Sequence, residues 1–160
     1  MGTLEIRIAK KGDEAMIVAL LRELAEYENL LHRFHITPEI VLRDYLGPHP
    51  VIFCDLAFEN DRSAGIATWY WSYGSFAATR RIFLADLFVR PEFRGKQYGR
   101  ALLANLAKRV IAHGGSGVDW EVLDWNKPSI GFYDSLGANE SKGWLTYNLS
   151  GDALSRLARS

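Results

Sequence analysis

Apolar and polar residues alternate with two different periods along the chain, and each period predicts a different element. Residues 4–10 alternate as a half-buried strand does, whereas residues 14–31 carry apolar side chains at helical spacing. Asp13 is in position to cap that first helix. Thr37-Pro38 predicts the start of a second helix, and Gly47-Pro48 predicts its end.

The middle and the end of the chain continue as short strands and helices. Residues 51–59 and 64–73 predict a hairpin, because a polar turn at residues 60–63 joins two apolar runs. The further predicted elements are a loop over 72–81, a strand 82–89, a helix 98–113, a strand 118–125, a short helix 129–136, a strand 143–149 and a final helix from Asp152. This order predicts an α/β fold with one mixed sheet flanked by helices, in a single domain over residues 1–160.

Composition and charge then narrow the function classes. The 19 Lys and Arg residues balance the 19 Asp and Glu residues, so bulk charge does not favour a nucleic-acid partner. No apolar stretch approaches the ~18 residues that a membrane span needs, and the N-terminus lacks a signal-peptide core. The single cysteine, Cys54, lies in an apolar run, which is typical of an inert core thiol. We therefore expect a soluble, cytoplasmic protein with no nucleic-acid or membrane partner.

The stretch VRPEFRGKQYGRALL, at residues 89–103, joins a predicted strand to a predicted helix through two glycines and several cations. Such a turn exposes the N–H groups of a helix N-terminus, and glycine lets a phosphate approach them. A plain tight turn with a solvated basic rim would use the same residues. The stretch has neither the P-loop pattern nor the dinucleotide-binding pattern, so the sequence supports neither of those nucleotide sites.

A second stretch, VLDWNKPSIGFYDSLGA at residues 122–138, helps to interpret the first. Together the two resemble the motifs of the GNAT superfamily of acyl-coenzyme A-dependent N-acetyltransferases. The pieces IRIAKKGD, LLRELAEYE and KGWLTYNL extend this likeness to the branch of diamine (spermidine/spermine) and thialysine N-acetyltransferases, over about residues 4–150. The resemblance implies the GNAT fold, acetyl-CoA as co-substrate, a small-molecule amine as acceptor and a homodimer.

The resemblance also implies which residues bind the coenzyme. Leu87, Phe88 and Val89 would hold the pantetheine arm through their backbones, with Asn126 and Ser129 on its other side. The diphosphate would lie on the turn and the helix start, which comprise Arg94, Gly95, Lys96, Gln97, Tyr98, Gly99 and Arg100. Gln97 replaces the family's middle glycine, so we expect it to keep a negative φ and to weaken coenzyme binding without abolishing it.

Acetyl transfer requires a neutral amine, a donor to the oxyanion and a proton for the departing thiolate. A primary amine costs roughly 4.6 kcal/mol to deprotonate at pH 7, so a nearby base helps. Following the resemblance, Tyr133 would stand near the sulfur as general acid, and the Val89 N–H would donate to the oxyanion. Judged without the resemblance, Tyr133 is typical of an aromatic residue packed on a sheet.

The acceptor side departs from the diamine acetyltransferases. Their glutamate before the aspartate of the fourth strand is Ala85 here, and their acid before the C-terminal Gly-Trp is Lys142, whereas Tyr27, Glu28 and Asp86 are kept. We expect Glu28 or Asp86 to meet the acceptor's ammonium and to assist its deprotonation. A small zwitterionic amine, such as a lysine-like amino acid, fits better than spermidine, because Lys142 would meet a carboxylate.

Several other residues are alternative candidates for the site. Glu121 and Asp124 have opposite parity in the predicted strand, so at most one faces the site, and Glu121 is a substitute candidate for the base. His32 and His35 fit solvated loop positions better than catalytic ones. The alternating aromatics at residues 69–73 fit a core or a dimer surface better than an acceptor wall. No His/Cys/Asp set has metal-ligand spacing, so we predict no metal.

Two other functions are compatible with the sequence. A protein or peptide acetyltransferase would use the small, basic loop at residues 72–81 as a docking surface. A non-catalytic sensor of acyl-coenzyme A would account for Gln97 and for the missing acid at Ala85.

Overall fold

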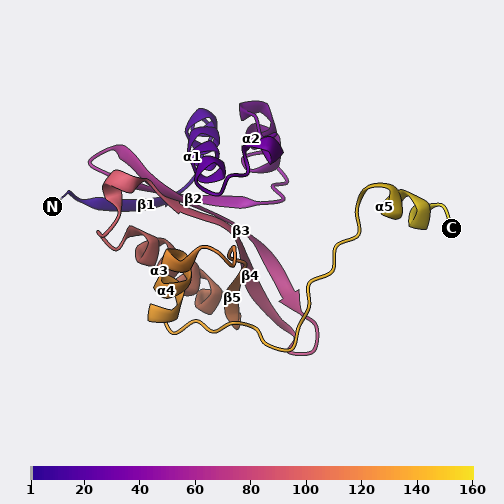
Figure 1. Cartoon of the computed structure of the whole chain (residues 1–160). Helices are drawn as coiled ribbons and strands as arrows, with labels where there is room; N and C mark the ends of the chain where they lie inside the picture. The colour runs from indigo at the N-terminus through magenta and orange to yellow at the C-terminus, as the bar shows by residue number, and fades with distance from the viewer. Residues whose placement is uncertain (1) are drawn as a thin grey trace. The chain divides into compact units, whose positions relative to one another are not determined.

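The computed structural model describes residues 2–160, which form two compact units, one ending at Glu121 and the other beginning at Val122. In Figure 1 the first unit is a sheet covered by helices. Its elements are, in chain order, β1 (Leu4–Ile8), α1 (Glu14–Tyr27), η1 (Leu31–Arg33), α2 (Pro38–Asp44), β2 (Phe53–Glu59), β3 (Arg62–Gly74), β4 (Thr79–Val89), η2 (Pro91–Phe93), α3 (Tyr98–Ala112) and β5 (Gly117–Trp120). The second unit holds α4 (Lys127–Ser135) and α5 (Gly151–Ala158).

The first unit contains the predicted mixed sheet. Its strands are ordered β1-β2-β3-β4-β5, and all neighbours are antiparallel except β4 and β5, which run parallel. The β2–β3 hairpin turns at Asn60 and Asp61, whose φ values of 50° and 64° suit a tight two-residue turn. The predicted loop at residues 72–81 is wrong, because β3 and β4 stay paired as far as Gly74 and Thr79. Only residues 75–78 form the turn.

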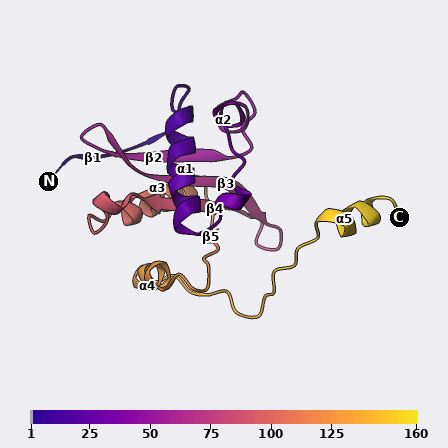
Figure 2. The same ribbon diagram turned by 45° about the horizontal axis from the view of Figure 1, so that its top comes forward.

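The two faces of the sheet have separate helical covers. α1 and α2 lie on one face and α3 lies on the other, as two views of the ribbon show (Figures 1 and 2). The core beneath α1 and α2 is apolar and includes Ile17, Leu20, Leu24, Val41, Cys54, Leu56, Ile66 and Phe88. Cys54 is buried as expected, at 2% exposure, and its burial raises the pKa of the thiol.

The end of α1 differs from the prediction in a way that positions a candidate residue. The helix ends at Tyr27 rather than near residue 31, because Asn29 turns left-handed with φ 58°. The Leu30 N–H then bonds back to the Ala25 carbonyl at 2.8 Å, which closes the helix as a Schellman-type end. Glu28 is therefore the first residue beyond the helix and not part of its exposed side.

The expected cap of α1 is also wrong. Asp13 precedes the helix but makes no side-chain capping bond to it. Its carboxylate instead accepts from the Arg7 guanidinium at 2.8 Å and from the Lys10 N–H at 2.8 Å. In contrast, Thr37 caps α2 through the Ile40 N–H, as the sequence predicts, although that helix ends before Gly47.

The fourth strand carries an irregularity that prepares the site. β4 pairs with β5 only from Arg81 to Leu84, so its last residues extend past β5. On its other side, the register with β3 shifts between Thr68 and Trp69, and Ala85 is left without a partner. Such a bulge kinks and twists the strand. Asp86 and the residues after it therefore form a stretch of β4 that only β3 pairs.

The regular secondary structure of the second unit is helical. Asn126 caps α4 by accepting the Ser129 N–H at 3.3 Å. The predicted strand at residues 143–149 is wrong, since the described residues of this unit contain no strand and an isolated strand leaves its backbone groups unpaired. The predicted strand 118–125 ends at Trp120, so Glu121 and Asp124 lie beyond β5 and the parity argument does not apply to them.

Candidate active site

The unpaired edge of β4 offers backbone groups to a ligand. The Arg90 N–H donates to the Ala64 carbonyl of β3 at 2.9 Å, so Arg90 directs its backbone toward β3. Because backbone direction alternates along a strand, Phe88 also faces β3, while Leu87 and Val89 face the opposite edge. Of the three residues predicted to bind the pantetheine arm, Leu87 and Val89 therefore have the backbone orientation that this role requires, and Phe88 does not.

The turn after η2 has the conformation of an anion site. Gly95 has a φ of 76°, and nothing lies within 4 Å of the position where a Cβ would stand. Ala101 is the first residue whose N–H bonds within α3, to the Gln97 carbonyl at 2.9 Å, so the preceding N–H groups of the helix are left for a ligand. No side chain caps α3. The residues present thus fit a diphosphate at this helix start.

Gln97 does not have the negative φ expected from the sequence, and the expected weakening of coenzyme binding stays a prediction. Its φ is 66° and its ψ is 16°, which is the left-handed conformation of the glycine that it replaces. The turn therefore keeps the glycine geometry with a side chain in place, at a conformational cost of about 1–2 kcal/mol. Lys96 is tied down as well, because its Nζ donates to Glu59 at 2.9 Å. Arg94 and Arg100 are, like Lys96, exposed cations of this turn.

Two carboxyl groups, those of Glu28 and Asp86, are close enough to interact electrostatically. Burial and the nearby Asp86 charge raise the pKa of Glu28, in that order of importance. Burial also raises the pKa of Asp86, although a hydrogen bond from the Thr68 hydroxyl opposes the shift. The structure thus brings together the two acids that the sequence assigns to the acceptor, one from the end of α1 and one from the bulged strand.

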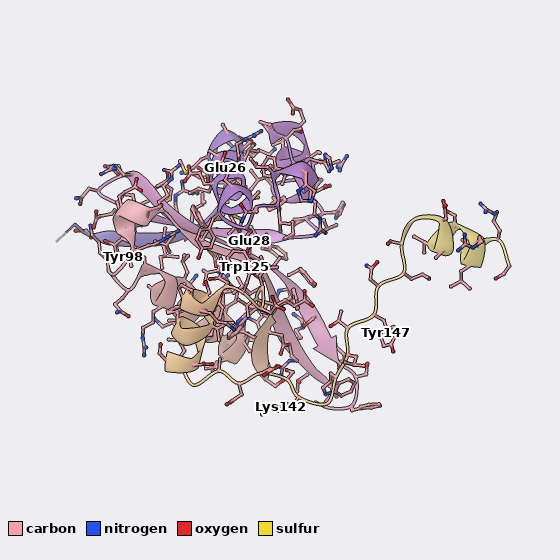
Figure 3. The ribbon with its side chains drawn as sticks, viewed as in Figure 1. Glu26, Glu28, Tyr98, Trp125, Lys142 and Tyr147 are labelled. Carbon is pink, nitrogen blue, oxygen red and sulfur yellow. The ribbon has the colours of Figure 1, made fainter. Side chains whose placement is uncertain are left out.

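An arginine of the turn contacts Tyr27, the residue before Glu28. The Arg94 Nε donates to the Val89 carbonyl at 3.0 Å, and its guanidinium lies 5.2 Å from the centre of the Tyr27 ring. Tyr27 precedes Glu28 at the end of α1, and Figure 3 labels Glu28. The first residue of the proposed phosphate loop therefore contacts Tyr27, one of the proposed acceptor residues, within the first unit.

Three residues of this region escaped the sequence interpretation. Thr68 lies in an apolar run and binds Asp86 across the strands. Tyr45, at the end of α2, is close enough to Asp86 for its charge to add to the burial that raises the tyrosine pKa. Glu59 ends β2 and binds the turn through Lys96. The β3–β4 register, which one sequence does not give, would have revealed Thr68. Tyr45 and Glu59 depend on how α2 and the turn before α3 pack in three dimensions, which local sequence pattern does not give either.

The remaining predicted residues belong to the second unit and are described there alone. Asn126 and Ser129 form the start of α4, and the Tyr133 ring lies 5.3 Å from that of Phe132 on the same helix. Lys142 lies in the irregular stretch between α4 and α5. The roles of these residues stay predictions.

Residues 2–160 contain neither a candidate metal site nor a candidate membrane-spanning helix. No cluster of three or more His, Cys, Asp or Glu side chains in this range is arranged to hold a metal ion. Within the same range, no helix combines the length and apolar character of a membrane span.

Comparison with known proteins decides the family. The sequence description of the acetyltransferase (GNAT) family matches residues 17–138. The chain belongs to this family. The GNAT chain is 33% identical to the thialysine N-epsilon-acetyltransferase of Sus scrofa, with 99% of each chain covered. It is 30% identical to the spermidine/spermine N(1)-acetyltransferase-like protein 1 of Homo sapiens, over 99% of this chain and 24% of that protein.

A solved structure supports the same fold. An integron cassette protein from V. cholerae superimposes on this GNAT chain with a TM-score of 0.83 and 26% identity, covering 98% of both chains. The expected fold and the expected branch are thus confirmed. The chain is an acetyl-CoA-dependent N-acetyltransferase related to thialysine N-epsilon-acetyltransferases.

Proposed function

We propose that this enzyme acetylates a primary amine of a small, zwitterionic molecule of the lysine-like amino-acid class. One observation carries the proposal: the Glu28 and Asp86 carboxyl groups are close enough for the Asp86 charge to raise the pKa of Glu28, and among residues 2–160 neither forms a salt bridge to a cation. An ammonium group placed between them would offset their mutual repulsion. Similarity to a spermidine/spermine acetyltransferase-like protein supports an amine acceptor, and similarity to thialysine N-epsilon-acetyltransferases supports an amino acid.

The proposed chemistry follows from the roles assigned to the protein groups. Glu28 or Asp86 accepts the proton of the ammonium, directly or through water, and a raised carboxyl pKa makes either group a better base near neutral pH. The neutral amine attacks the thioester carbonyl, and the Val89 N–H donates to the oxygen that becomes negative. The carbon–sulfur bond breaks, and the sulfur takes a proton from Tyr133. Acetyl-CoA supplies the acetyl group and the leaving thiol.

A matched pair of acceptors tests the substrate class. L-lysine and its decarboxylated diamine present the same distal amine, and they differ only in the carboxylate that Lys142 is proposed to meet. We expect kcat/KM to favour the amino acid, and we expect Lys142→Ala to reduce that preference without lowering the rate on the diamine. Mass spectrometry of a mixed amine pool extends the test to other acceptors. Spermidine exceeding every amino acid by tenfold or more would exclude the proposed class.

Replacement of Tyr133 separates an enzyme from a binding module. Tyr133→Phe should lower kcat about hundredfold while leaving the affinity for coenzyme A unchanged, because only the proton donor is removed. A sensor would show no turnover with any amine in the wild-type protein. A peptide acetyltransferase would acetylate peptides but not free amines, and the paired strands at residues 72–81 no longer provide the open loop that this alternative used.

A cytoplasmic location and a homodimer remain part of the proposal. The β3 strand exposes Tyr70 and Tyr73, and the stretch before α5 exposes Trp144 and Tyr147, the last of which Figure 3 labels. Large exposed apolar side chains of this kind are suited to contact between subunits. Sedimentation of the purified protein at micromolar concentration would measure the assembly state, and a monomer there would exclude the homodimer.

A further inference from the structure

The turn that precedes α3 holds a strained residue. Gln97 has φ 66° and makes no side-chain capping bond, so its own side chain does not stabilise the conformation. Glutamine is not among the residues that favour left-handed backbone, as glycine and asparagine are. Some other contact must therefore hold this part of the turn.

A single carboxylate binds the residues on both sides of Gln97. Glu59, the last residue of β2, accepts from the Lys96 Nζ at 2.9 and 3.0 Å. The same carboxylate accepts from the Tyr98 hydroxyl at 2.5 Å. Lys96 and Tyr98 are the immediate neighbours of Gln97, so a strand end fixes the turn before and after the strained position.

Burial makes this arrangement rigid. Glu59 is 8% exposed and Tyr98 is 6% exposed. The Tyr98 ring stacks on Phe93 of η2 at 6.4 Å, and Figure 3 shows Tyr98 where α3 begins beside the sheet. The segment from η2 to α3 is therefore anchored at its start, at its end and on both sides of Gln97.

We infer that Glu59 is a positioning residue for the coenzyme: by binding Lys96 and Tyr98 it holds Gln97 left-handed and keeps the N–H groups of α3 aimed at the diphosphate. This inference rests on the proposed coenzyme site. It explains how a chain without the family's middle glycine keeps the glycine conformation. It also changes the role of Lys96, which becomes an anchor of the turn instead of a phosphate ligand.

The energetics favour the anchor role for Lys96. If its ammonium moved to a phosphate, Glu59 would keep only Tyr98 as a hydrogen-bond donor within the described residues. Removing the cation from a buried carboxylate costs more free energy than forming an exposed ion pair gains. The hydrogen bonds from Lys96 and Tyr98 lower the pKa of Glu59, so the carboxylate stays ionised and keeps both neighbours bound.

Four proteins test the inference: wild type, Glu59→Gln, Gln97→Gly and the double variant. Calorimetry measures the Kd for coenzyme A, and steady-state kinetics separates KM for acetyl-CoA from kcat. We expect Glu59→Gln to weaken coenzyme A about tenfold and to raise KM with little change in kcat, since the chemical groups stay in place. With glycine at position 97 the left-handed turn needs no support. The same Glu59→Gln change in the Gln97→Gly background should therefore cost threefold or less.

Asp55→Asn is the matched control. Asp55 lies on the same strand, is also buried, and binds Arg109 and Asn105 of α3 rather than the turn. It should reduce thermal stability and leave the coenzyme A affinity within twofold of wild type. A comparable loss of affinity in Asp55→Asn would mean that the Glu59 effect is general destabilisation, and would overturn the inference.

The remaining outcomes are distinct. Wild-type protein that ignores millimolar coenzyme A would overturn the proposed function together with this inference. Normal affinity in wild type with unchanged affinity in Glu59→Gln would overturn the inference alone. Tighter binding in Glu59→Gln would also overturn it, because Lys96 would then be a phosphate ligand that Glu59 restrains.

If Glu59→Gln does not fold, Tyr98→Phe is the second variant, because it removes one of the two side chains that bind Glu59. It should weaken coenzyme A about threefold, with rescue by Gln97→Gly, and unchanged affinity would again overturn the inference.

Discussion

The acidic side chains on the two faces of the sheet differ in whether a cation of the protein binds them. On the α3 face, β2 carries Asp55 and Glu59, and each is bound by a cation and a further donor. On the α1 face, Glu28 and Asp86 lie close enough to repel each other, and the Thr68 hydroxyl is the one donor recorded to this pair among residues 2–160. The protein thus neutralises the carboxylates of Asp55 and Glu59, which join structural elements. Glu28 and Asp86, where the substrate is proposed to bind, have no such cation from the described residues.

The largest expected effect is on catalysis. Glu28→Gln or Asp86→Asn should lower kcat/KM for the amine about hundredfold, because each removes a candidate base and part of the attraction for the ammonium. Wild-type kcat/KM should rise with pH as these carboxyl groups ionise. The measurement is a steady-state rate at fixed, saturating acetyl-CoA.

Glu26 gives a control on the same helix. It lies two residues before Glu28, and it is exposed (Figure 3). Glu26→Gln should leave kcat/KM within twofold of wild type. An equal loss in the Glu26 and Glu28 variants would show that net charge, and not the acid pair, attracts the substrate.

The next effect is on stability, and it concerns the neutralised acids. Asp55→Asn should lower the free energy of unfolding by about 2–3 kcal/mol, because it leaves the Arg109 guanidinium against the sheet without its charge partner. This corresponds to a melting temperature about 5–10 °C lower. Thermal unfolding followed by circular dichroism measures it, and an unchanged midpoint would contradict the comparison.

The smallest expected effect is a gain in stability, opposite in sign to the loss expected for Asp55→Asn. The raised pKa of Asp86 means that the folded state holds this proton more tightly than the unfolded state does. Stability should therefore be lost as pH rises from the ordinary value of 3.8 through the raised pKa, and the ionised group should destabilise the protein at pH 7. Asp86→Asn should raise the free energy of unfolding at pH 7 by about 0.5–1 kcal/mol while it reduces activity.

Urea unfolding at several pH values measures that gain. Thr68 can donate to an asparagine oxygen, so the substitution keeps the cross-strand hydrogen bond. The gain should shrink as the pH falls toward the raised pKa. A destabilised Asp86→Asn at neutral pH would show that this carboxylate supports the fold, as Asp55 does.

Much of the fold could be predicted from periodicity and turn residues. Alternation identified the strands, and the Thr37-Pro38 pair correctly placed the start of α2. The wrong predictions share a cause, since each depended on partners that are distant in the sequence. Pairing with β4 extended β3 to Gly74, and the lack of a partner strand left residues 143–149 irregular. Local pattern cannot report either condition.

The candidate site shows the same limit. The two motifs and the residues before them indicated Glu28, Asp86 and the turn at residues 94–100 from the sequence alone. The sequence did not indicate that Gln97 would be left-handed, because the carboxylate that binds its neighbour Lys96 belongs to Glu59 at the end of a different strand. Nor could it separate Phe88 from its neighbours, since backbone direction follows from the register with β3.

The burial of Cys54 has a practical consequence for measuring this enzyme. It is the protein's single cysteine, and burial raises the pKa of its thiol, so little thiolate is available to an electrophile in the folded state. Every turnover releases a coenzyme with a free, solvent-accessible sulfhydryl. A disulfide chromogen added to the assay would therefore record product against an almost silent protein background, without mutation of the cysteine.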